Sequence, residues 1–122
     1  MHIPIFDGLT KSYKVQQNRI KIDQIQNEYM LLQNTIDLEV QRARINLNNA
    51  ITVFNTQKEN MDLTLEVYEV TKIKYQEGLG SNLEVIEADA SLKNAQNNYY
   101  NAMYQVLISK VKLEKSLGTL YQ

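Results

Sequence analysis

Two stretches of this chain repeat one seven-residue pattern, and a short glycine-containing break separates them. In each stretch a series of large side chains is interleaved with a series of mostly smaller ones. The upstream series are Val40, Leu47, Phe54, Met61, Tyr68 and Tyr75, interleaved with Ile36, Ala43, Ala50, Gln57, Thr64 and Thr71. The downstream series are Val85, Leu92, Tyr99, Val106, Leu113 and Leu120, interleaved with Ala88, Ala95, Ala102, Ser109 and Ser116. A strict seven-residue repeat keeps an apolar seam on one side of a helix, so both stretches predict coiled-coil helices.

The upstream helix is expected to be unusually long. Pro4 and Gly8 punctuate the apolar opening of the chain, which predicts an extended lead-in over residues 1–9. No proline or glycine then occurs until Gly78, which predicts one helix over residues 10–77, about 100 Å long. A polar first third still carries apolar residues at heptad-like spacing: Ile20, Ile22, Ile25, Tyr29 and Leu32.

The break between the stretches has the chemistry of a tight helical turn. Gly78 can adopt the left-handed conformation that ends a helix, so we expect the turn at residues 78–81. Ser81 and Glu84 have the spacing of a capping box, in which each side chain accepts a hydrogen bond from a free backbone amide. A second helix is therefore expected over residues 82–117. Gly118 is expected to stop it and to begin a tail over residues 118–122, in which Leu120 folds back as the hydrophobic contact.

These elements predict an all-α fold, a long antiparallel coiled-coil hairpin with unequal arms. The returning helix reaches back only to about residue 40 and leaves about 30 helical residues without an intramolecular partner. Because isolated helices are marginal in water, those residues need cover from outside the hairpin. We expect either an oligomer or a piece of a larger chain. Large and small seam residues are expected to interlock.

Composition excludes several classes of function. Lysine and arginine number 13 against 14 acidic residues, so no basic excess favours nucleic acid. The chain lacks cysteine, and its single histidine, His2, stands at the chain end, so neither a metal site nor a cofactor is expected. No nucleophile and base are paired, which argues against an enzyme. The longest apolar run, residues 29–32, is too short to span a bilayer, and no signal segment opens the chain.

Five features follow one another along the chain: Ile3-Pro4-Ile5-Phe6-Asp7-Gly8, the uninterrupted helix, Tyr75-Gln76-Glu77-Gly78, Leu83-Glu84-Val85-Ile86-Glu87-Ala88 and Leu117-Gly118-Thr119-Leu120. In this order they resemble the C-terminal half of TolC-like outer-membrane efflux proteins. The resemblance covers essentially the whole chain. Leu9 stands where the family usually has a second glycine.

The resemblance implies a trimeric exit duct, with a barrel in the outer membrane and a helical tunnel through the periplasm. This chain would be a segment of that tunnel, and the barrel strands would lie outside it. The turn at Gly78 would be the periplasmic tip, where the adaptor protein of an inner-membrane pump docks. We expect a fragment that is itself soluble, does not insert into the membrane, and associates as a dimer or a higher oligomer.

The same resemblance assigns roles to residues around the turn. Glu84 and Glu87 match acidic side chains at the tunnel constriction, although both also suit the first turn of a helix. Tyr75 matches a tyrosine that helps to close the entrance, or it simply ends the seam. Gly80 replaces a basic residue of some members. The surface facing the adaptor would comprise Gly78, Leu79, Gly80, Ser81, Asn82 and Leu83, or these residues only build the turn.

Two functions agree with these patterns. The preferred one is a passive component of an efflux or type I secretion channel. The alternative is a structural coiled coil, including the helical hairpin of an adaptor protein, which would have arms of nearly equal length. The Pro-Ile-Phe-Asp-Gly opening and the unequal arms favour the channel.

Overall fold

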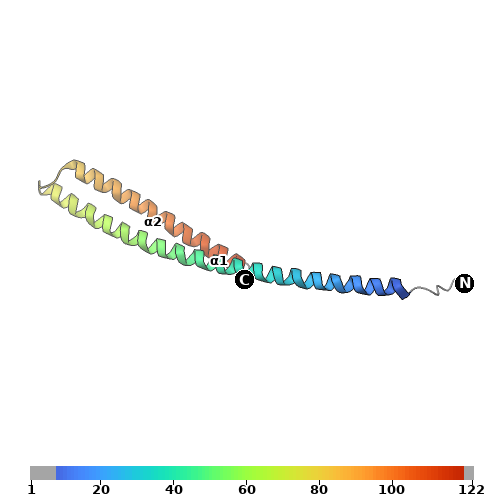
Figure 1. Cartoon of the computed structure of the whole chain (residues 1–122). Helices are drawn as coiled ribbons and strands as arrows, with labels where there is room; N and C mark the ends of the chain where they lie inside the picture. The colour runs from blue at the N-terminus through green and yellow to red at the C-terminus, as the bar shows by residue number, and fades with distance from the viewer. Residues whose placement is uncertain (1–7, 120–122) are drawn as a thin grey trace. The chain divides into compact units, whose positions relative to one another are not determined.

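The computed structural model describes residues 8–119, and these residues form two helices and no strand. Helix α1 spans Gly8–Gln76 and helix α2 spans Asn82–Ser116 (Figure 1). The predicted all-α hairpin with unequal arms is confirmed, since α1 has 69 residues and α2 has 35. The chain divides into an N-terminal unit, Met1–Glu39, and a hairpin unit, Val40–Gln122.

The start of α1 differs from the expected extended lead-in over residues 1–9. Gly8 and Leu9 are already helical. The glycine does not prevent this, because glycine is conformationally permissive and a helix end commonly shifts by one or two residues. Residues 1–7, including Pro4 and His2, lie outside the described part of the chain.

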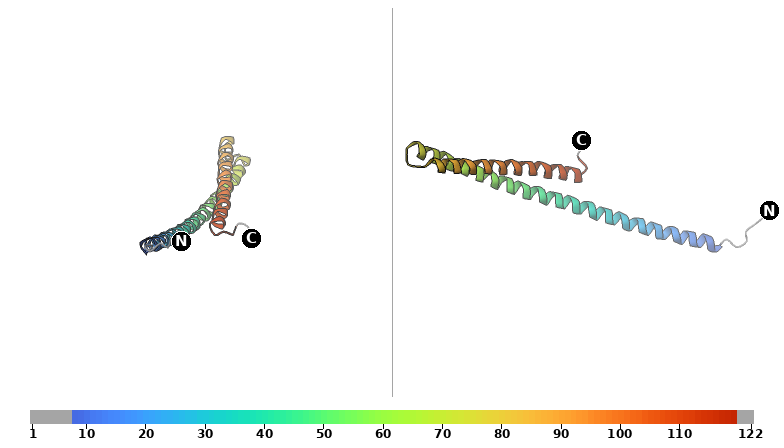
Figure 2. Two further views of the ribbon diagram at one scale, coloured as in Figure 1. Left: turned by 90° about the vertical axis from the view of Figure 1, so that its right-hand side faces the viewer. Right: turned by 90° about the horizontal axis from the view of Figure 1, so that it is seen from above.

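In the hairpin unit, residues 40–76 of α1 and the whole of α2 lie side by side and antiparallel (Figures 1 and 2). The residues of α1 that are shielded from solvent are those of the two predicted series: Val40, Ala43, Leu47, Ala50, Phe54, Gln57, Met61, Thr64, Tyr68 and Thr71. Their spacing alternates between three and four residues, as in a coiled-coil seam. Two residues of the predicted series fall outside this seam, because Ile36 is 47% exposed and Tyr75 is 45% exposed.

Two alanines and one leucine of α2 are the most buried residues of the seam. Ala95 is 5% exposed, Ala102 is 6% exposed and Leu92 is 7% exposed. Between the two alanines, Tyr99 projects towards α1. The centroid of its ring lies 5.2 Å from the centroid of the Phe54 ring. The small residues therefore let the two helices approach, and the aromatic pair fills the space between the alanine layers.

Polar side chains in the seam are satisfied to different degrees. The hydroxyl groups of Thr64 and Thr71 donate to the carbonyl oxygens of Asn60 and Val67 at 2.6 and 2.7 Å, so each threonine can pack its methyl group in the seam. Gln57 differs, because its buried Oε1 has no hydrogen-bond partner. An unsatisfied buried acceptor costs free energy, so Gln57 is a weak point of the seam.

The end of α2 is closed by Gly118, whose φ is +72°. The amides of Gly118 and Thr119 donate to the carbonyl oxygens of Lys115 and Glu114 at 3.1 and 3.0 Å. This pair of bonds is a Schellman motif, and it satisfies carbonyl groups that a helix end leaves free. The expected fold-back of Leu120 lies outside the described residues.

The N-terminal unit has no buried side chain among residues 11–39. Its exposed residues include eleven large apolar ones: Tyr13, Val15, Ile20, Ile22, Ile25, Tyr29, Met30, Leu31, Leu32, Ile36 and Leu38. Because most helical stability in proteins comes from packing of an apolar face, this unit depends on cover that the described residues of the unit itself do not supply.

Enlarging a small seam residue should destabilise the hairpin. We expect Ala102→Leu to lower the free energy of unfolding by about 1–3 kcal/mol, because the extra carbons have no space between the helices. Ala90→Leu is the matched control, since Ala90 is exposed on the same helix. Urea unfolding followed by circular dichroism, at one protein concentration, measures both. Equal effects of the two substitutions would contradict the close packing at Ala102.

Candidate functional site at the helical turn

The turn between the helices is fixed by backbone hydrogen bonds at the end of α1. Gly78 has φ +75°, and its amide donates to the carbonyl oxygen of Tyr75 at 3.0 Å. The amide of Leu79 reaches back to the carbonyl oxygen of Lys74 at 2.9 Å, which completes a second Schellman motif. No atom lies within 4 Å of the place where a Cβ of Gly78 would be. Glycine is favoured at this position by the positive φ alone.

Gly80 differs from Gly78 because other atoms of the turn lie close to it. A Cβ on Gly80 would lie 3.2 Å from Oε2 of Glu84 and 3.4 Å from the backbone nitrogen of Tyr75. The first distance is short and the second is an ordinary contact, so a side chain at residue 80 would require a small shift, most simply of the flexible Glu84 carboxylate.

The start of α2 is held by a capping box. The amide of Glu84 donates to the hydroxyl oxygen of Ser81 at 3.2 Å, and the amide of Ser81 donates to Oε2 of Glu84 at 3.3 Å. Ser81 is extended, with φ −100° and ψ 153°, as an N-cap residue requires. The carboxylate of Glu84 is therefore engaged at the turn.

The residues of the turn leave apolar side chains in solvent. Leu79 is 78% exposed and Leu83 is 63% exposed, while Asn82 beside them is also exposed. Ile86 follows Leu83 by one helical turn and is 57% exposed. Hydrogen bonds of the backbone and of the cap hold this turn in place without using these apolar side chains.

The two candidate acidic residues have different surroundings. Glu84 serves the cap, whereas the exposed side chain of Glu87 makes no hydrogen bond or ion pair among the described residues. Further along α2, Asp89 accepts a hydrogen bond from Nζ of Lys93 at 2.6 Å. That hydrogen bond, and then the charge of Asp89, raise the pKa of Lys93. Of the two candidate residues, Glu87 is thus the one whose carboxylate is not already engaged.

Sequence reasoning did not include Ile86 among the residues of the turn surface. The signal was available, because Ile86 lies outside the heptad series of α2 and follows Leu83 by three positions. The described residues contain no cluster of three or more potential metal ligands, and neither helix has an apolar stretch suited to crossing a bilayer.

Comparison with known proteins identifies the class of this chain. The chain belongs to the outer membrane efflux protein family, whose model matches residues 1–119. It is 23% identical over 118 residues to the outer membrane protein TolC of Escherichia coli (strain K12), an alignment that covers 97% of this chain and 24% of TolC. The chain thus spans about a quarter of the length of this relative. No solved structure matches it at a significant level.

Removing the cap should weaken the hairpin. We expect Ser81→Ala to lower the free energy of unfolding by about 1 kcal/mol, because the Glu84 amide loses its acceptor. Ser91→Ala is the matched control, since the Ser91 hydroxyl donates only to a carbonyl of its own helix, that of Glu87. Chemical unfolding monitored by circular dichroism compares the two variants. A larger loss of stability for Ser81→Ala than for Ser91→Ala confirms the role of the cap, and equal losses contradict it.

Proposed function

We propose that this chain is a segment of the periplasmic tunnel wall of an outer-membrane efflux channel, and that its helical turn docks an adaptor protein. The single observation that carries the docking proposal is the exposure of Leu79 and Leu83 on a turn whose backbone is already fixed. A docking surface with a preset backbone loses little conformational entropy on binding. Membership of the efflux family supports the channel part of the proposal.

Transport by such a segment is passive. In the proposed channel, three copies surround a common axis, and the helices supply the shape and charge of the lumen. Residues near the turn then affect passage in two ways. Leu79, Leu83 and the adjacent Asn82 form the contact with the adaptor, while Tyr75, 45% exposed at the end of α1, contributes to closing the entrance.

Glu87 is the better candidate for the acidic constriction. Three copies around an axis concentrate negative charge, which favours cations over anions in the lumen. The carboxylate of Glu84 already accepts the Ser81 amide, so its main role is to hold the turn. The unpaired carboxylate of Glu87, one turn further into α2, is the one that can face permeating ions.

The docking proposal predicts a specific loss of binding. We expect the double variant Leu79→Asn, Leu83→Asn to bind the adaptor of an inner-membrane pump at least about tenfold more weakly, because apolar anchors carry much of the energy of an interface. Leu63→Asn is the matched control, since Leu63 is 60% exposed on α1 away from the turn. Biolayer interferometry with the purified chain and the adaptor measures the affinities. Equal affinities of the double variant and the unchanged chain would exclude the turn as the docking surface.

The constriction proposal predicts a change of ion selectivity. In the trimeric channel that contains this segment, we expect Glu87→Gln to lower the preference for cations, because three negative charges leave the lumen. Reversal potentials in planar bilayers under a salt gradient measure this preference. Glu59→Gln, which removes an exposed charge far from the turn, should leave it unchanged. The assignment fails if Glu87→Gln leaves the reversal potential where it was.

A further inference from the structure

The N-terminal unit carries an exposed apolar stripe. Its members are Val15, Ile22, Ile25, Tyr29, Leu32 and Ile36, and they are between 47% and 68% exposed. From Ile22 onward the spacing alternates between three and four residues, which is the spacing of a coiled-coil seam. The stripe therefore has the form of a surface that receives another helix.

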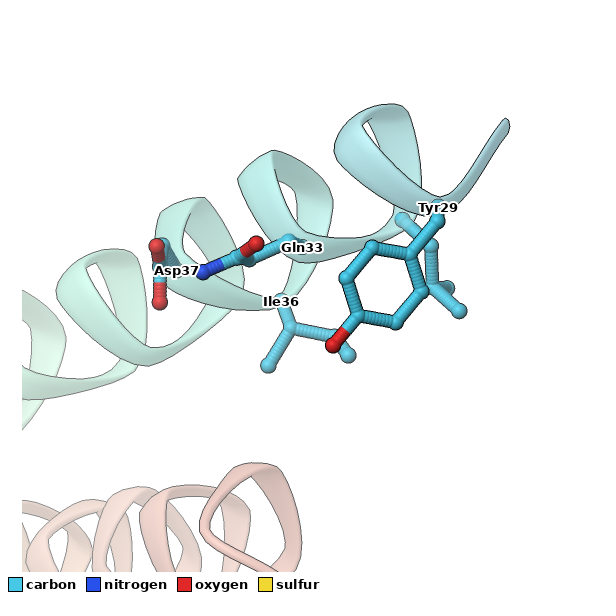
Figure 3. A pocket seen from close by; sticks show the side chains of 5 residues that line it. Tyr29, Gln33, Ile36 and Asp37 are labelled. Carbon is cyan, nitrogen blue, oxygen red and sulfur yellow. The ribbon is translucent and has the colours of Figure 1, made fainter. Parts of the chain in front are cut away.

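Two open depressions lie on this unit. One is lined by Tyr29, Leu32, Gln33 and Ile36, with Asp37 at its edge. Figure 3 shows the Tyr29 ring and the Ile36 side chain on the same side of the helix. The other is lined by Ser12, Val15, Gln16 and Arg19. The first set includes three stripe residues, and its spacing i, i+3, i+4, i+7 is that of a hole that accepts the knob of a facing helix. The second set includes only Val15 of the stripe, beside three polar residues.

Charge is divided sharply along the same unit. Residues 8–22 contain Lys11, Lys14, Arg19 and Lys21 and no acidic residue, a net charge of +4. Residues 23–39 contain Asp23, Glu28, Asp37 and Glu39 and no basic residue, a net charge of −4. No ion pair forms within this unit among the described residues. An antiparallel second copy places each charged half against its opposite.

The charges that flank the stripe select the orientation. Val15, Ile22, Tyr29 and Ile36 are seven residues apart and take the first position of each heptad. In a parallel pair, the residue just before this position faces the residue five places later in the other helix. Lys14 would therefore face Arg19. This contact is repulsive. In an antiparallel pair with Ile22 opposite Ile25, Lys21 faces Glu28 instead, and symmetry makes this attractive contact twice.

The same charges select the register. A shift by one heptad in either direction brings Lys21 against Lys21 or Glu28 against Glu28, so both shifted registers are repulsive. With Ile22 opposite Ile25, Val15 of one copy comes opposite Leu32 of the other. This places Val15 of each copy at the hole that Tyr29, Leu32, Gln33 and Ile36 form on the other.

We propose that the N-terminal unit binds a second copy of this chain as an antiparallel two-helix coiled coil over residues 11–36. Its twofold axis passes between Asp23 and Gln24, and Lys21 pairs with Glu28 of the second copy. This inference does not depend on the proposed channel function, because its surfaces and its test involve only the chain itself.

Charge reversal tests the pairing. We expect Lys21→Glu and Glu28→Lys each to weaken the dimer about tenfold in sedimentation equilibrium, because each variant creates like-charge contacts at both equivalent sites. The double variant Lys21→Glu, Glu28→Lys should recover to within about threefold, since it restores opposite charges. Lys72→Glu and Glu59→Lys are the controls, with the same charge changes at exposed positions of the hairpin unit. A double variant no tighter than the single ones overturns the pairing.

The apolar contact is tested separately. We expect Ile25→Gln to weaken the dimer more than Leu31→Gln, because Ile25 belongs to the stripe and Leu31 does not. The two positions are similarly exposed, at 63% and 67%. Circular dichroism of each variant checks that the helices persist. Equal weakening by both substitutions would exclude the stripe as the contact.

Spin labels test the orientation. The chain has no cysteine, so Gln24→Cys and Asn34→Cys each give one labelled site per copy. In the antiparallel pair the labels at residue 24 are level with each other, whereas those at residue 34 are separated along the axis by about 30 Å. Pulsed electron paramagnetic resonance should therefore give a longer distance for residue 34. Equal distances at the two sites, or a monomer at the concentrations needed, overturn the proposal.

Discussion

The close packing of large against small side chains between α1 and α2 is the constraint on which the hairpin depends. Ala95 and Ala102 are almost completely buried, and the ring of Tyr99 between them meets Phe54 from the opposite helix. This alternation fixes the register of the two helices, because a slip would bring large residues together. With the register fixed, the length of the link between the helices is also fixed, and the turn must close within residues 77–81.

The turn uses one set of groups to hold its conformation and another set to present an apolar surface. Its conformation is held by the Schellman bonds around Gly78 and by the capping box of Ser81 and Glu84. None of these bonds uses an apolar side chain, so Leu79 and Leu83 can remain in solvent without loosening the turn. A surface of this kind is shaped before its partner arrives. This separation also explains why the acidic groups differ, since Glu84 is used within the turn and Glu87 is not.

Sequence alone predicts the seam and the chemistry of the turn, because both depend on local spacing. The heptad series identifies every shielded position of α1 between Val40 and Thr71. The close approach of Gly80 to Glu84 and the unpaired Oε1 of Gln57 are different, since they depend on how atoms of distant residues meet in space. Periodicity also identified an apolar face before residue 40, but periodicity does not show which element covers that face. The roles of Glu87 and Tyr75 stay predictions for the same reason, since they concern other copies of the chain.

The charges of the N-terminal unit restrict which helix can bind it, whereas its apolar face does not. A stripe such as the one from Val15 to Ile36 attracts many helices, because apolar contact has little directional preference. The division into a basic and an acidic half restricts the choice to a helix that presents the opposite order of charges. One face holds one helix at a time. A second copy of this chain and any helix of the proposed channel that covers the same stripe therefore exclude each other, so the proposed homodimer would have to separate before the proposed channel assembles.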